Sequence, residues 1–458
     1  MKFINLTRRT EIGANCYYCE SGDESFVLDS GMHPKEDGEE ATPNFAAIAD
    51  REVDAIIVSH AHLDHFGTLP VLMRRQPQAR VFMTEATAEI GSALLHNSVN
   101  VMTKQREELG RSLPPLFTHK ETNRAAESWR SCRYRQVMKL SGDRVREAEG
   151  KGVTFEFLDA GHVLGSAGVM LRAEGRTFFY TGDVHFDSQT IAQAAAFPES
   201  GVDVLIIETT RGDHPEPEGF TRAAEEQRLA EAIAREFARG GCVLIPVFAL
   251  GKTQELMAII HRWRREGVLG EFPLYIGGLS TKMTEIYDRF ALTSRRNFPR
   301  LQLLEALEPF ILNGQNIHEA PARGGRVYAL SSGMMTPKTL SNAFARQIIS
   351  DPQHSIFFVG YADPESPGGI LRHAKPGDMV PLDPDQPAQE LRCKIETFNF
   401  SAHASRESIL EYIKKLAPKK VVLVHGDPPA VEWLRAQAAA ALPGSEVIVP
   451  PPGAEIEL

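Results

Sequence analysis

Short apolar runs that end in a polar residue or a glycine recur along the whole chain. Residues 53–58 lead into a histidine-rich stretch, residues 153–158 into Asp159-Ala160-Gly161-His162, and residues 204–207 into Glu208. An apolar run of about four to eight residues bounded by turn residues is typical of a buried strand. The pattern therefore predicts a sheet-based fold in which the strand ends present polar side chains.

The middle of the chain has a different rhythm, in which strand-like runs alternate with stretches of helical periodicity. We predict strands at 243–248, 273–276, 326–330 and 355–361, and helices at 251–265, 281–290 and 340–349. Repeated strand–helix–strand units indicate a parallel sheet with right-handed crossovers. We therefore place a second domain in this part of the chain.

The carboxyl ends of these middle strands are rich in glycine and hydroxyl side chains. Ser331-Ser332-Gly333 is the clearest case, and Gly251 and Gly360-Tyr361 follow two other predicted strands. Ligands of open parallel sheets bind at this edge, where backbone N–H groups at a helix start can face an anion. A glycine between strand and helix is more often only a turn, but three at one edge favour a substrate groove. Its candidate residues are Ser331, Ser332, Gly333, Gly360 and Tyr361.

The strongest chemical signal is the stretch His60-Ala61-His62-Leu63-Asp64-His65, which places four potential metal ligands directly after a predicted strand. Neutral imidazole and carboxylate suit zinc and similar divalent ions. A polar surface loop explains one or two such residues but not all four. We therefore predict a metal site, and the alternation of ligands could serve two adjacent ions.

Other predicted strand ends supply the further ligands that a two-metal site needs. His162 follows residues 153–158 and lies in a glycine-containing turn, Asp183 follows residues 177–180, and His425 follows residues 420–424. Glycines next to these residues allow sharp backbone turns at the strand ends. With the histidine cluster they complete one candidate set.

These residues, in this order, resemble the metallo-β-lactamase fold and, over nearly the whole chain, its β-CASP group of nucleases. The resemblance implies that His60, His62 and His162 hold one metal ion, that Asp64, His65 and His425 hold a second, and that Asp183 bridges both. Asp29 matches an early acidic residue that supports the ligands through hydrogen bonds. The implied cofactors are two divalent ions, Zn²⁺ in the first place and Mn²⁺ as the alternative.

Three positions separate the nucleases of this group from the small-molecule hydrolases. Glu208 matches a motif with an acidic residue at a strand end, and His403, in Ser401-Ala402-His403-Ala404, matches a second motif. Alone, Glu208 would be read as a surface glutamate and His403 as a helix-start residue. His425 coincides with a third motif, where members that act on RNA have histidine and those that act on DNA have valine. The resemblance therefore favours RNA, single-stranded in particular.

The resemblance also implies a domain plan within the α/β class. Residues 1–210 and 391–458 would form a metallo-β-lactamase αββα sandwich, and residues 211–390 an inserted β-CASP domain built on a parallel α/β sheet. Residues 10–16 are similar to ribonuclease J and to the endonuclease subunit of messenger-RNA 3′-end processing. Because the chain ends at Leu458, we expect no extra carboxy-terminal domain of the ribonuclease J kind.

One motif departs from the family pattern. After Gly360-Tyr361 the family commonly has Glu-Gly-Thr and then a basic residue, whereas this chain continues with Ala362-Asp363-Pro364. The basic side chain is therefore missing at that place, and Arg372 or Lys375 is the candidate substitute.

From the composition we expect a globular protein of the cytoplasm. Its 42% hydrophobic and 24% charged residues are typical of a globular protein. Its length of 458 residues exceeds that of one ordinary hydrophobic core, so we expect two domains. It has no stretch of membrane-span length and no signal-peptide core at its start, so we expect no membrane association. Its five cysteines, an odd number, suggest reduced thiols.

The formal net charge of −10 would repel a polyanion, so attraction of a nucleic acid must be local. Residues 120–139 carry six basic residues against only two acidic ones, with Trp129 and Tyr134 among them. A solvated helix face is the ordinary explanation of such a run. RNA contact, with the two rings stacking on bases, is the alternative.

We expect a metal-dependent ribonuclease that hydrolyses phosphodiester bonds with 5′-phosphate and 3′-hydroxyl products, with Asp64, His403 and Glu208 as catalytic residues. A small-molecule hydrolase of the lactonase or glyoxalase type would use the same metal cluster but gives no reason for Glu208 and His403. A DNA nuclease is disfavoured by His425 alone, and loss of activity in favour of a scaffold role would require loss of ligands. Endonuclease or 5′-exonuclease mode, and monomer or homodimer, stay open.

Overall fold

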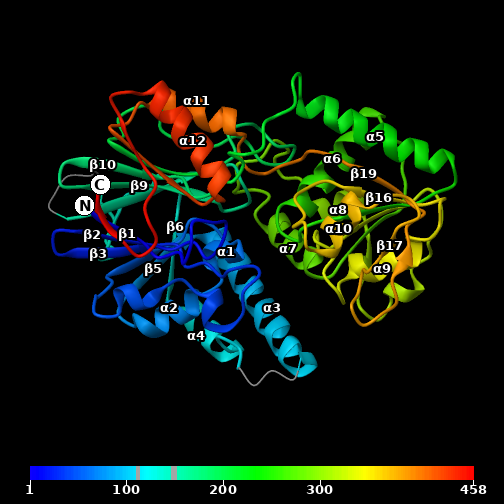
Figure 1. Ribbon diagram of the computed structural model, residues 1–458, viewed down its shortest axis with the longest axis horizontal. Helices are drawn as coiled ribbons and strands as arrows, with labels where there is room; N and C mark the ends of the chain where they lie inside the picture. The colour runs from blue at the N-terminus through cyan, green and yellow to red at the C-terminus, as the bar shows by residue number, and fades with distance from the viewer. Residues whose placement is uncertain (110–113, 146–151) are drawn as a thin grey trace. The chain divides into compact units, whose positions relative to one another are not determined.

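The computed structural model describes residues 1–109, 114–145 and 152–458. The chain divides into two compact units (Figure 1). Unit 1 consists of Met1–Ser188, Ala194–Glu216 and His403–Leu458, and unit 2 of Gln189–Gln193 and Pro217–Ala402. Because unit 2 interrupts unit 1 in the sequence, it is an insertion.

Unit 1 is built on two mixed sheets of seven strands each. In spatial order the first sheet contains β22 (Glu455–Glu457), β1 (Lys2–Asn5), β2 (Tyr17–Ser21), β3 (Glu24–Leu28), β4 (Ala55–Ile57), β5 (Arg80–Thr84) and β6 (Trp129–Cys132). The second contains β21 (Glu446–Ile448), β20 (Lys420–Val424), β11 (Val204–Glu208), β10 (Arg176–Tyr180), β9 (Ala167–Ala173), β8 (Thr154–Asp159) and β7 (Met138–Lys139). Pairing of β1 with β22 brings the two chain termini together.

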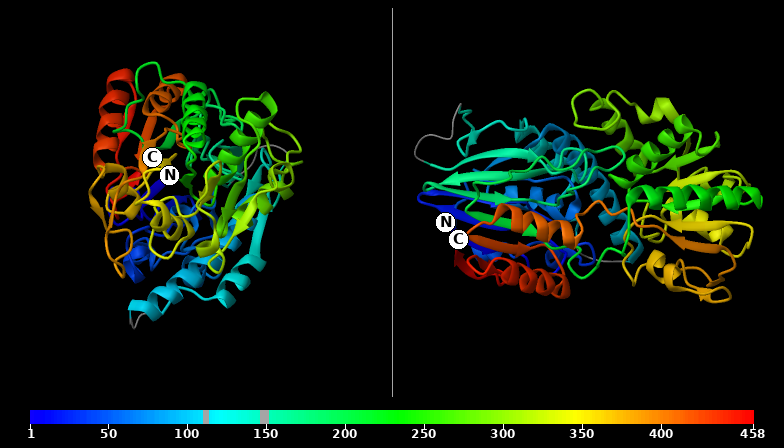
Figure 2. Two further views of the ribbon diagram at one scale, coloured as in Figure 1. Left: turned by 90° about the vertical axis from the view of Figure 1, so that its right-hand side faces the viewer. Right: turned by 90° about the horizontal axis from the view of Figure 1, so that it is seen from above.

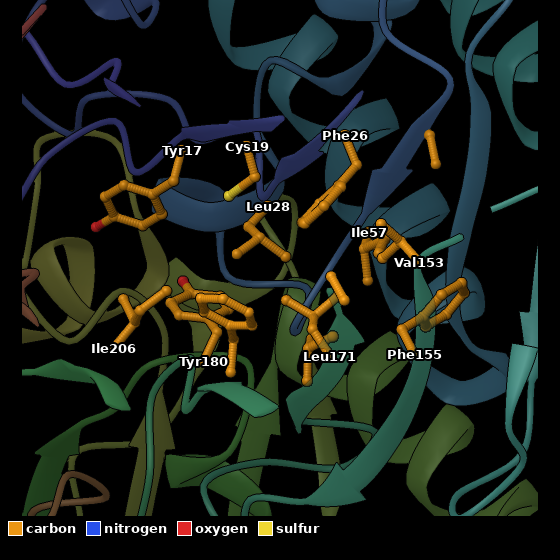
Figure 3. Packing of buried hydrophobic residues seen from close by; sticks show 14 of the residues in the cluster. Tyr17, Cys19, Phe26, Leu28, Ile57, Val153, Phe155, Leu171, Tyr180 and Ile206 are labelled. Atoms are coloured by element: carbon orange, nitrogen blue, oxygen red, sulfur yellow. The ribbon is translucent and has the colours of Figure 1, made fainter. Parts of the chain in front are cut away.

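The two sheets of unit 1 pack face to face through a shared apolar core. Phe26, Leu28 and Ile57 of the first sheet meet Phe155 and Leu171 of the second in this core (Figure 3). Side chains alternate along a strand, and the outer face of each sheet is also buried. In β4, Ala55 and Ile57 face the shared core while Ile56 packs beneath helices, which explains why the run is apolar throughout.

Helices cover the outer faces of both sheets of unit 1. The first sheet is covered by α1 (Leu63–Phe66), α2 (Leu69–Arg75), α3 (Glu85–Leu109) and α4 (His119–Ser128), with the 3₁₀ helices Gly38–Ala41 and Phe45–Ile48 beside them. The second sheet is covered by α11 (Arg406–Leu416) and α12 (Pro428–Ala441). Figure 2 shows the sheets between the blue helices and the orange to red ones. The predicted αββα sandwich is confirmed.

Unit 2 is built on one parallel sheet of six strands. In spatial order these are β14 (Phe310–Leu312), β13 (Leu274–Gly277), β15 (Val327–Leu330), β12 (Val243–Pro246), β16 (Ser355–Phe358) and β19 (Lys394–Thr397). Its helices are α5 (Arg222–Ala238), α6 (Lys252–Glu266), α7 (Leu279–Arg289), α8 (Leu303–Leu307), a 3₁₀ turn at Ile317–Glu319, α9 (Leu340–Ile348) and α10 (Pro367–His373). A two-stranded ribbon of β17 (Met379–Val380) and β18 (Gln389–Glu390) completes the unit.

The strands and helices predicted from periodicity are present in unit 2, with small shifts at their ends. The predicted strand 355–361 ends at Phe358, because Gly360 and Tyr361 belong to the following loop. Periodicity missed β14, a three-residue edge strand whose Phe310 and Ile311 are exposed. Among the described residues, no helix is both long and apolar enough to cross a membrane. All five cysteines are buried and unbridged.

Candidate metal centre

The loop after β4 brings two of its histidines together with His162. His60 Nε2 lies 3.2 Å from His62 Nδ1, which lies 3.1 Å from His162 Nε2. His162 comes from the loop between β8 and β9, where the Ser166 hydroxyl accepts hydrogen bonds from the backbone N–H groups of His162 and Val163. Three imidazole nitrogens therefore converge on one point, in the geometry of a shared ligand site.

A second group of potential ligands lies beside the first. Asp64 and His65, on the one-turn helix α1, meet His425, which directly follows β20. His425 Nε2 lies 3.4 Å from Asp64 Oδ2, and His425 Nδ1 lies 2.8 Å from the Thr210 hydroxyl. His425 has a φ of 51°, the left-handed turn that swings its ring back over the strand end.

Asp183 lies between the two groups and faces both. Its Oδ2 is 3.4 Å from His60 Nε2 and 3.6 Å from His162 Nε2, while its Oδ1 is 3.1 Å from His65 Nε2. Although the side chain is only 2% exposed, Oδ1 receives no well-directed hydrogen bond. A buried carboxylate oxygen without a donor is costly unless a cation meets it. This donor set therefore fits divalent metal ions.

The protonation states of the first group also fit metal ligation. Burial lowers the pKa of His62 to about 3 and that of His162 well below its ordinary value. Burial alone would raise the pKa of Asp183, but the neighbouring imidazoles of His65 and His425 hold it well below its ordinary value. Neutral imidazole and ionised carboxylate are the forms that bind metal.

Asp29 holds the cluster from behind through four hydrogen bonds. Its carboxylate accepts from the backbone N–H and hydroxyl of Ser59, at 2.6 and 2.8 Å, and from the Tyr180 hydroxyl at 2.6 Å. The fourth contact, 2.7 Å from Oδ2 to His65 Nδ1, fixes the ring so that Nε2 points to Asp183. Such outer contacts orient metal ligands and raise their basicity. The sequence pattern gave no sign of Ser59, Tyr180 or Ser166 in these supporting positions.

Glu208 and His403 form a pair at the border of the cluster. Glu208, the last residue of β11, accepts a 2.7 Å hydrogen bond from the Val184 N–H through Oε1, and its Oε2 lies 3.0 Å from His403 Nδ1. Burial lowers the pKa of His403, but the carboxylates of Glu208 and Asp183 outweigh it and raise this pKa to about 9. The side chain of His403 is 24% exposed. The pair therefore presents a cationic, partly accessible imidazole beside Asp183, with 3.9 Å between His403 Nδ1 and Asp183 Oδ2.

The five groove candidates lie in unit 2, at the carboxyl ends of β15 and β16. The Ser331 hydroxyl donates to the Gly277 carbonyl at 3.3 Å, and Ser332 bonds to Thr336. A Cβ on Gly333 would lie 2.9 Å from the Phe248 ring, so glycine is needed for close packing of two loops. These residues share one sheet edge, which suits an anion.

A basic side chain does reach the loop after β16. Arg372, on α10, donates a 3.0 Å hydrogen bond to the Gly360 carbonyl, and its guanidinium lies 5.7 Å from the Phe358 ring centroid. Tyr361 is 60% exposed beside it. Of the two predicted substitutes for the missing basic residue, Arg372 is therefore the one in contact with this loop.

The two aromatic residues of the basic segment 120–139 pack inward. Trp129 makes an edge-on contact with Phe66, with 5.4 Å between ring centroids, and the Tyr134 hydroxyl donates to the Ser166 carbonyl at 3.0 Å. Both are only partly exposed. Their rings therefore have structural contacts, which argues against the base-stacking role considered from the sequence.

Three family profiles together match most of the chain. Residues 9–229 match the metallo-beta-lactamase superfamily, residues 253–371 the Beta-Casp domain, and residues 389–450 the Zn-dependent metallo-hydrolase RNA specificity domain. The third range contains both His403 and His425.

Several curated proteins are similar over nearly the whole chain. Transcription termination factor FttA of Methanothermobacter thermautotrophicus is 29% identical over 91% of this chain and 65% of its own length. Cleavage and polyadenylation specificity factor subunit 3 of Dictyostelium discoideum is 30% identical over 96% of this chain and 55% of its own length. An RNase J-like protein of Methanocaldococcus jannaschii is 27% identical over 91% of this chain and 90% of its own length. The chain thus spans less than two thirds of the first two relatives.

A solved structure of a protein of unknown function from Enterococcus faecalis V583 has the same fold. Its TM-score is 0.56 at 14% identity, covering 100% of this chain and 99% of that one.

Proposed function

Since the chain belongs to the β-CASP group of the metallo-β-lactamase superfamily, we propose that it is a metal-dependent ribonuclease that hydrolyses phosphodiester bonds of single-stranded RNA. The observation that carries the proposal is the pairing of Glu208 with His403 beside the histidine–aspartate cluster. A hydrolase of small esters needs the cluster but has no use for a cationic imidazole held next to it, whereas a phosphodiester anion does. His425, by its family motif, favours RNA over DNA.

The proposed metal centre holds two Zn²⁺ ions, with Mn²⁺ as the alternative that the same ligands accept. His60, His62 and His162 would hold one ion, Asp64, His65 and His425 the other, and Asp183 both. When bound, these ions would supply Lewis acidity and a hydroxide nucleophile at neutral pH.

The remaining steps belong to side chains of this protein. Asp64, which is partly exposed, would accept a hydrogen bond from the attacking water and orient it. His403, held at Nδ1 by Glu208, would donate from Nε2 to a phosphate oxygen or to the leaving oxygen. Its raised pKa keeps the proton in place at neutral pH. The expected products carry a 5′-phosphate and a 3′-hydroxyl.

Unit 2 would contribute contacts to the RNA backbone through Ser331, Ser332, Gly333, Gly360 and Tyr361. Hydroxyl groups, backbone N–H groups and one exposed ring at one sheet edge suit a phosphate chain without base preference. We also propose residues 211–390 as the inserted domain and the cytoplasm as location, in line with five unbridged thiols.

The decisive test compares cleavage of 5′-labelled and internally labelled RNA by the wild type, Asp64→Ala and His403→Ala, with a matched DNA strand as substrate control. We expect RNA to be cut by the wild type and by neither variant, with bound metal, measured by mass spectrometry, retained in His403→Ala. The two labels distinguish internal cleavage from 5′-end trimming. Undiminished cleavage by Asp64→Ala would refute the assignment.

A further inference from the structure

An open hollow with a volume of about 400 Å³ lies at one edge of unit 1, in the segment that joins its two sheets. Its lining includes Arg133, Arg135 and Arg144, with Tyr134 and Gln136 between them. The segment starts where β6, the edge strand of the first sheet, ends, and continues into β7, the edge strand of the second. The hollow is therefore fixed by both sheets.

The three arginines of this arginine hollow are exposed. Among the described residues, none of the three forms an ion pair or a side-chain hydrogen bond, whereas Arg51, Arg74 and Arg172 of the same unit are paired with glutamates. The carboxylate of Asp143, in the adjoining turn, accepts from the Ser141 hydroxyl. In a chain of net charge −10, three guanidinium groups that have no partner within residues 1–109, 114–145 and 152–458 surround one hollow and would attract an anion.

The part of the hollow with Arg133 and Arg135 lies toward the side of unit 1 that carries the candidate metal ligands, because the Arg135 N–H bonds to the Phe157 carbonyl near the end of β8. Strands β4, β5 and β6 run parallel, with Ile57, Phe82 and Arg130 in one register row. Two strand spacings, about 10 Å, separate the end of β4, which leads to His60, from the end of β6, which leads to Arg133. Tyr134, on the wall of the hollow, bonds to Ser166, whose hydroxyl holds the His162 loop.

We infer that the arginine hollow binds the phosphate backbone of the RNA next to the scissile bond. The inference rests on the proposed function for the choice of RNA. Tyr134 uses its hydroxyl inside the protein, and the guanidinium groups offer charge and paired donors to phosphate but no base-reading pattern. The contact would therefore be independent of sequence, and it would serve RNAs long enough to reach from the metal centre to the hollow.

The test replaces all three arginines by glutamine in the metal-loaded protein and measures binding of a non-cleavable RNA of about 20 nucleotides by fluorescence anisotropy. The matched control is Lys414→Gln, Lys415→Gln and Arg435→Gln, which removes the same charge from α11 and α12. Because each phosphate contact on a single strand contributes about 0.7 to the slope of log affinity against log salt, the slope should fall by about 2. The ratio of the wild-type affinity to the variant affinity should then shrink roughly 20-fold between 50 and 200 mM salt.

Kinetics separate this inference from the proposed function. We expect the hollow variant to raise the KM for long RNA with little change in kcat, and to leave cleavage of a trinucleotide and of bis-p-nitrophenyl phosphate unchanged. An unchanged slope, or an equal loss in the control variant, overturns the inference while RNA cleavage stands. Wild-type protein that binds RNA through the hollow but never cuts it overturns only the proposed function. Tighter binding of polyglutamate than of RNA would overturn the inference and assign the hollow to an acidic protein.

Discussion

A buried charged cluster of unit 1 and one of unit 2 differ in how their charges are balanced. In unit 2, the Glu255 carboxylate accepts hydrogen bonds from the N–H groups of Thr190 and Ile191, at 2.6 and 2.9 Å, and from Arg222. Its neighbour Glu226 pairs with Arg222 and Arg262. In unit 1, Asp183 is as buried as Glu255, at 2% exposure, yet its Oδ1 has no well-directed donor.

The charges explain the difference. The unit 2 cluster balances two carboxylates against two guanidinium groups, so its charges cancel, although Glu226 Oε2 and Arg222 Nε also lack a well-directed hydrogen bond. The unit 1 cluster gathers Asp29, Asp64 and Asp183 around imidazoles, which balance the carboxylates only while they carry protons, so that metal ions can take over this balance. A closed, charge-balanced cluster such as that of unit 2 stabilises a fold, whereas the open cluster of unit 1 is a candidate metal site.

The most direct test of this difference between the clusters is Asp183→Asn, which removes one buried charge and keeps the shape of the side chain. We expect RNA cleavage to fall by more than the roughly 10- to 100-fold typical of an outer contact, because a residue facing both groups is lost. Adding metal should raise the denaturant midpoint of the wild type but not that of the variant, because a ligand that binds only the folded state stabilises it. Metal analysis and urea unfolding with and without metal give the two readouts; an equal metal-dependent shift of the midpoint in the variant would contradict the open-cluster interpretation.

The opposite result is expected from Glu255→Gln in unit 2. Removing the charge of Glu255 leaves Arg222, whose side chain is 20% exposed, with Glu226 as its remaining carboxylate, so the loss of unfolding free energy should be about 3 kcal/mol, the lower end for a broken buried pair. Metal content should stay at the wild-type value. Glu236→Gln on α5 is the control, because that buried glutamate pairs with the half-exposed Arg239.

Acid should reveal the same contribution of Glu255 in the wild type. Burial acts to raise the pKa of Glu255, but Arg222 and two backbone N–H groups lower it below its ordinary value of 4.5. A carboxylate whose folded pKa is depressed stabilises the fold above its unfolded pKa, and this is lost as the pH falls through the folded pKa. Below pH 4.5 the stability gap between wild type and Glu255→Gln should therefore narrow; a constant gap from pH 7 to pH 3 would show that the charge is not involved.

Glu208→Gln tests whether the pair with His403 acts on chemistry or on folding. Loss of the carboxylate should free the orientation of the His403 ring and lower kcat roughly 100-fold, with metal content and KM little changed. Glu208 also holds the Val184 N–H, and glutamine retains an oxygen for this contact. Equal losses in kcat and in thermal stability would indicate a purely structural role.

What the sequence could predict follows the same division. The cluster in unit 1 was visible because its candidate ligands follow predicted strands, in a spacing that no solvated loop explains, and the structure brings all seven together in two neighbouring groups. The cluster in unit 2 could not be recognised from the sequence, because Glu226 and Glu255 lie on charged helices whose pattern resembles a solvated surface. The four contacts of Asp29 join residues up to 151 positions apart, so no local pattern reports them. The domain boundaries stay a prediction.

The smallest effect should come from Tyr180→Phe, which deletes one hydroxyl from the support of the open cluster. The lost contact is the 2.6 Å hydrogen bond to Asp29 Oδ2, the oxygen that also faces His65 Nδ1. We expect metal affinity to fall about 10-fold, while kcat at saturating metal changes little, because the ligands themselves are intact. Tyr18→Phe is the matched control. The Tyr18 hydroxyl donates to Glu20, and Tyr18 packs under the helices, on the face of the first sheet that is turned away from the core containing Tyr180. A competitive chelator titration measures both variants. Asp29 keeps three hydrogen-bond donors in Tyr180→Phe. A loss of metal affinity as large as that of Asp183→Asn would therefore mean that the orientation of Asp29 depends on this one bond, contrary to the redundancy that its four contacts imply.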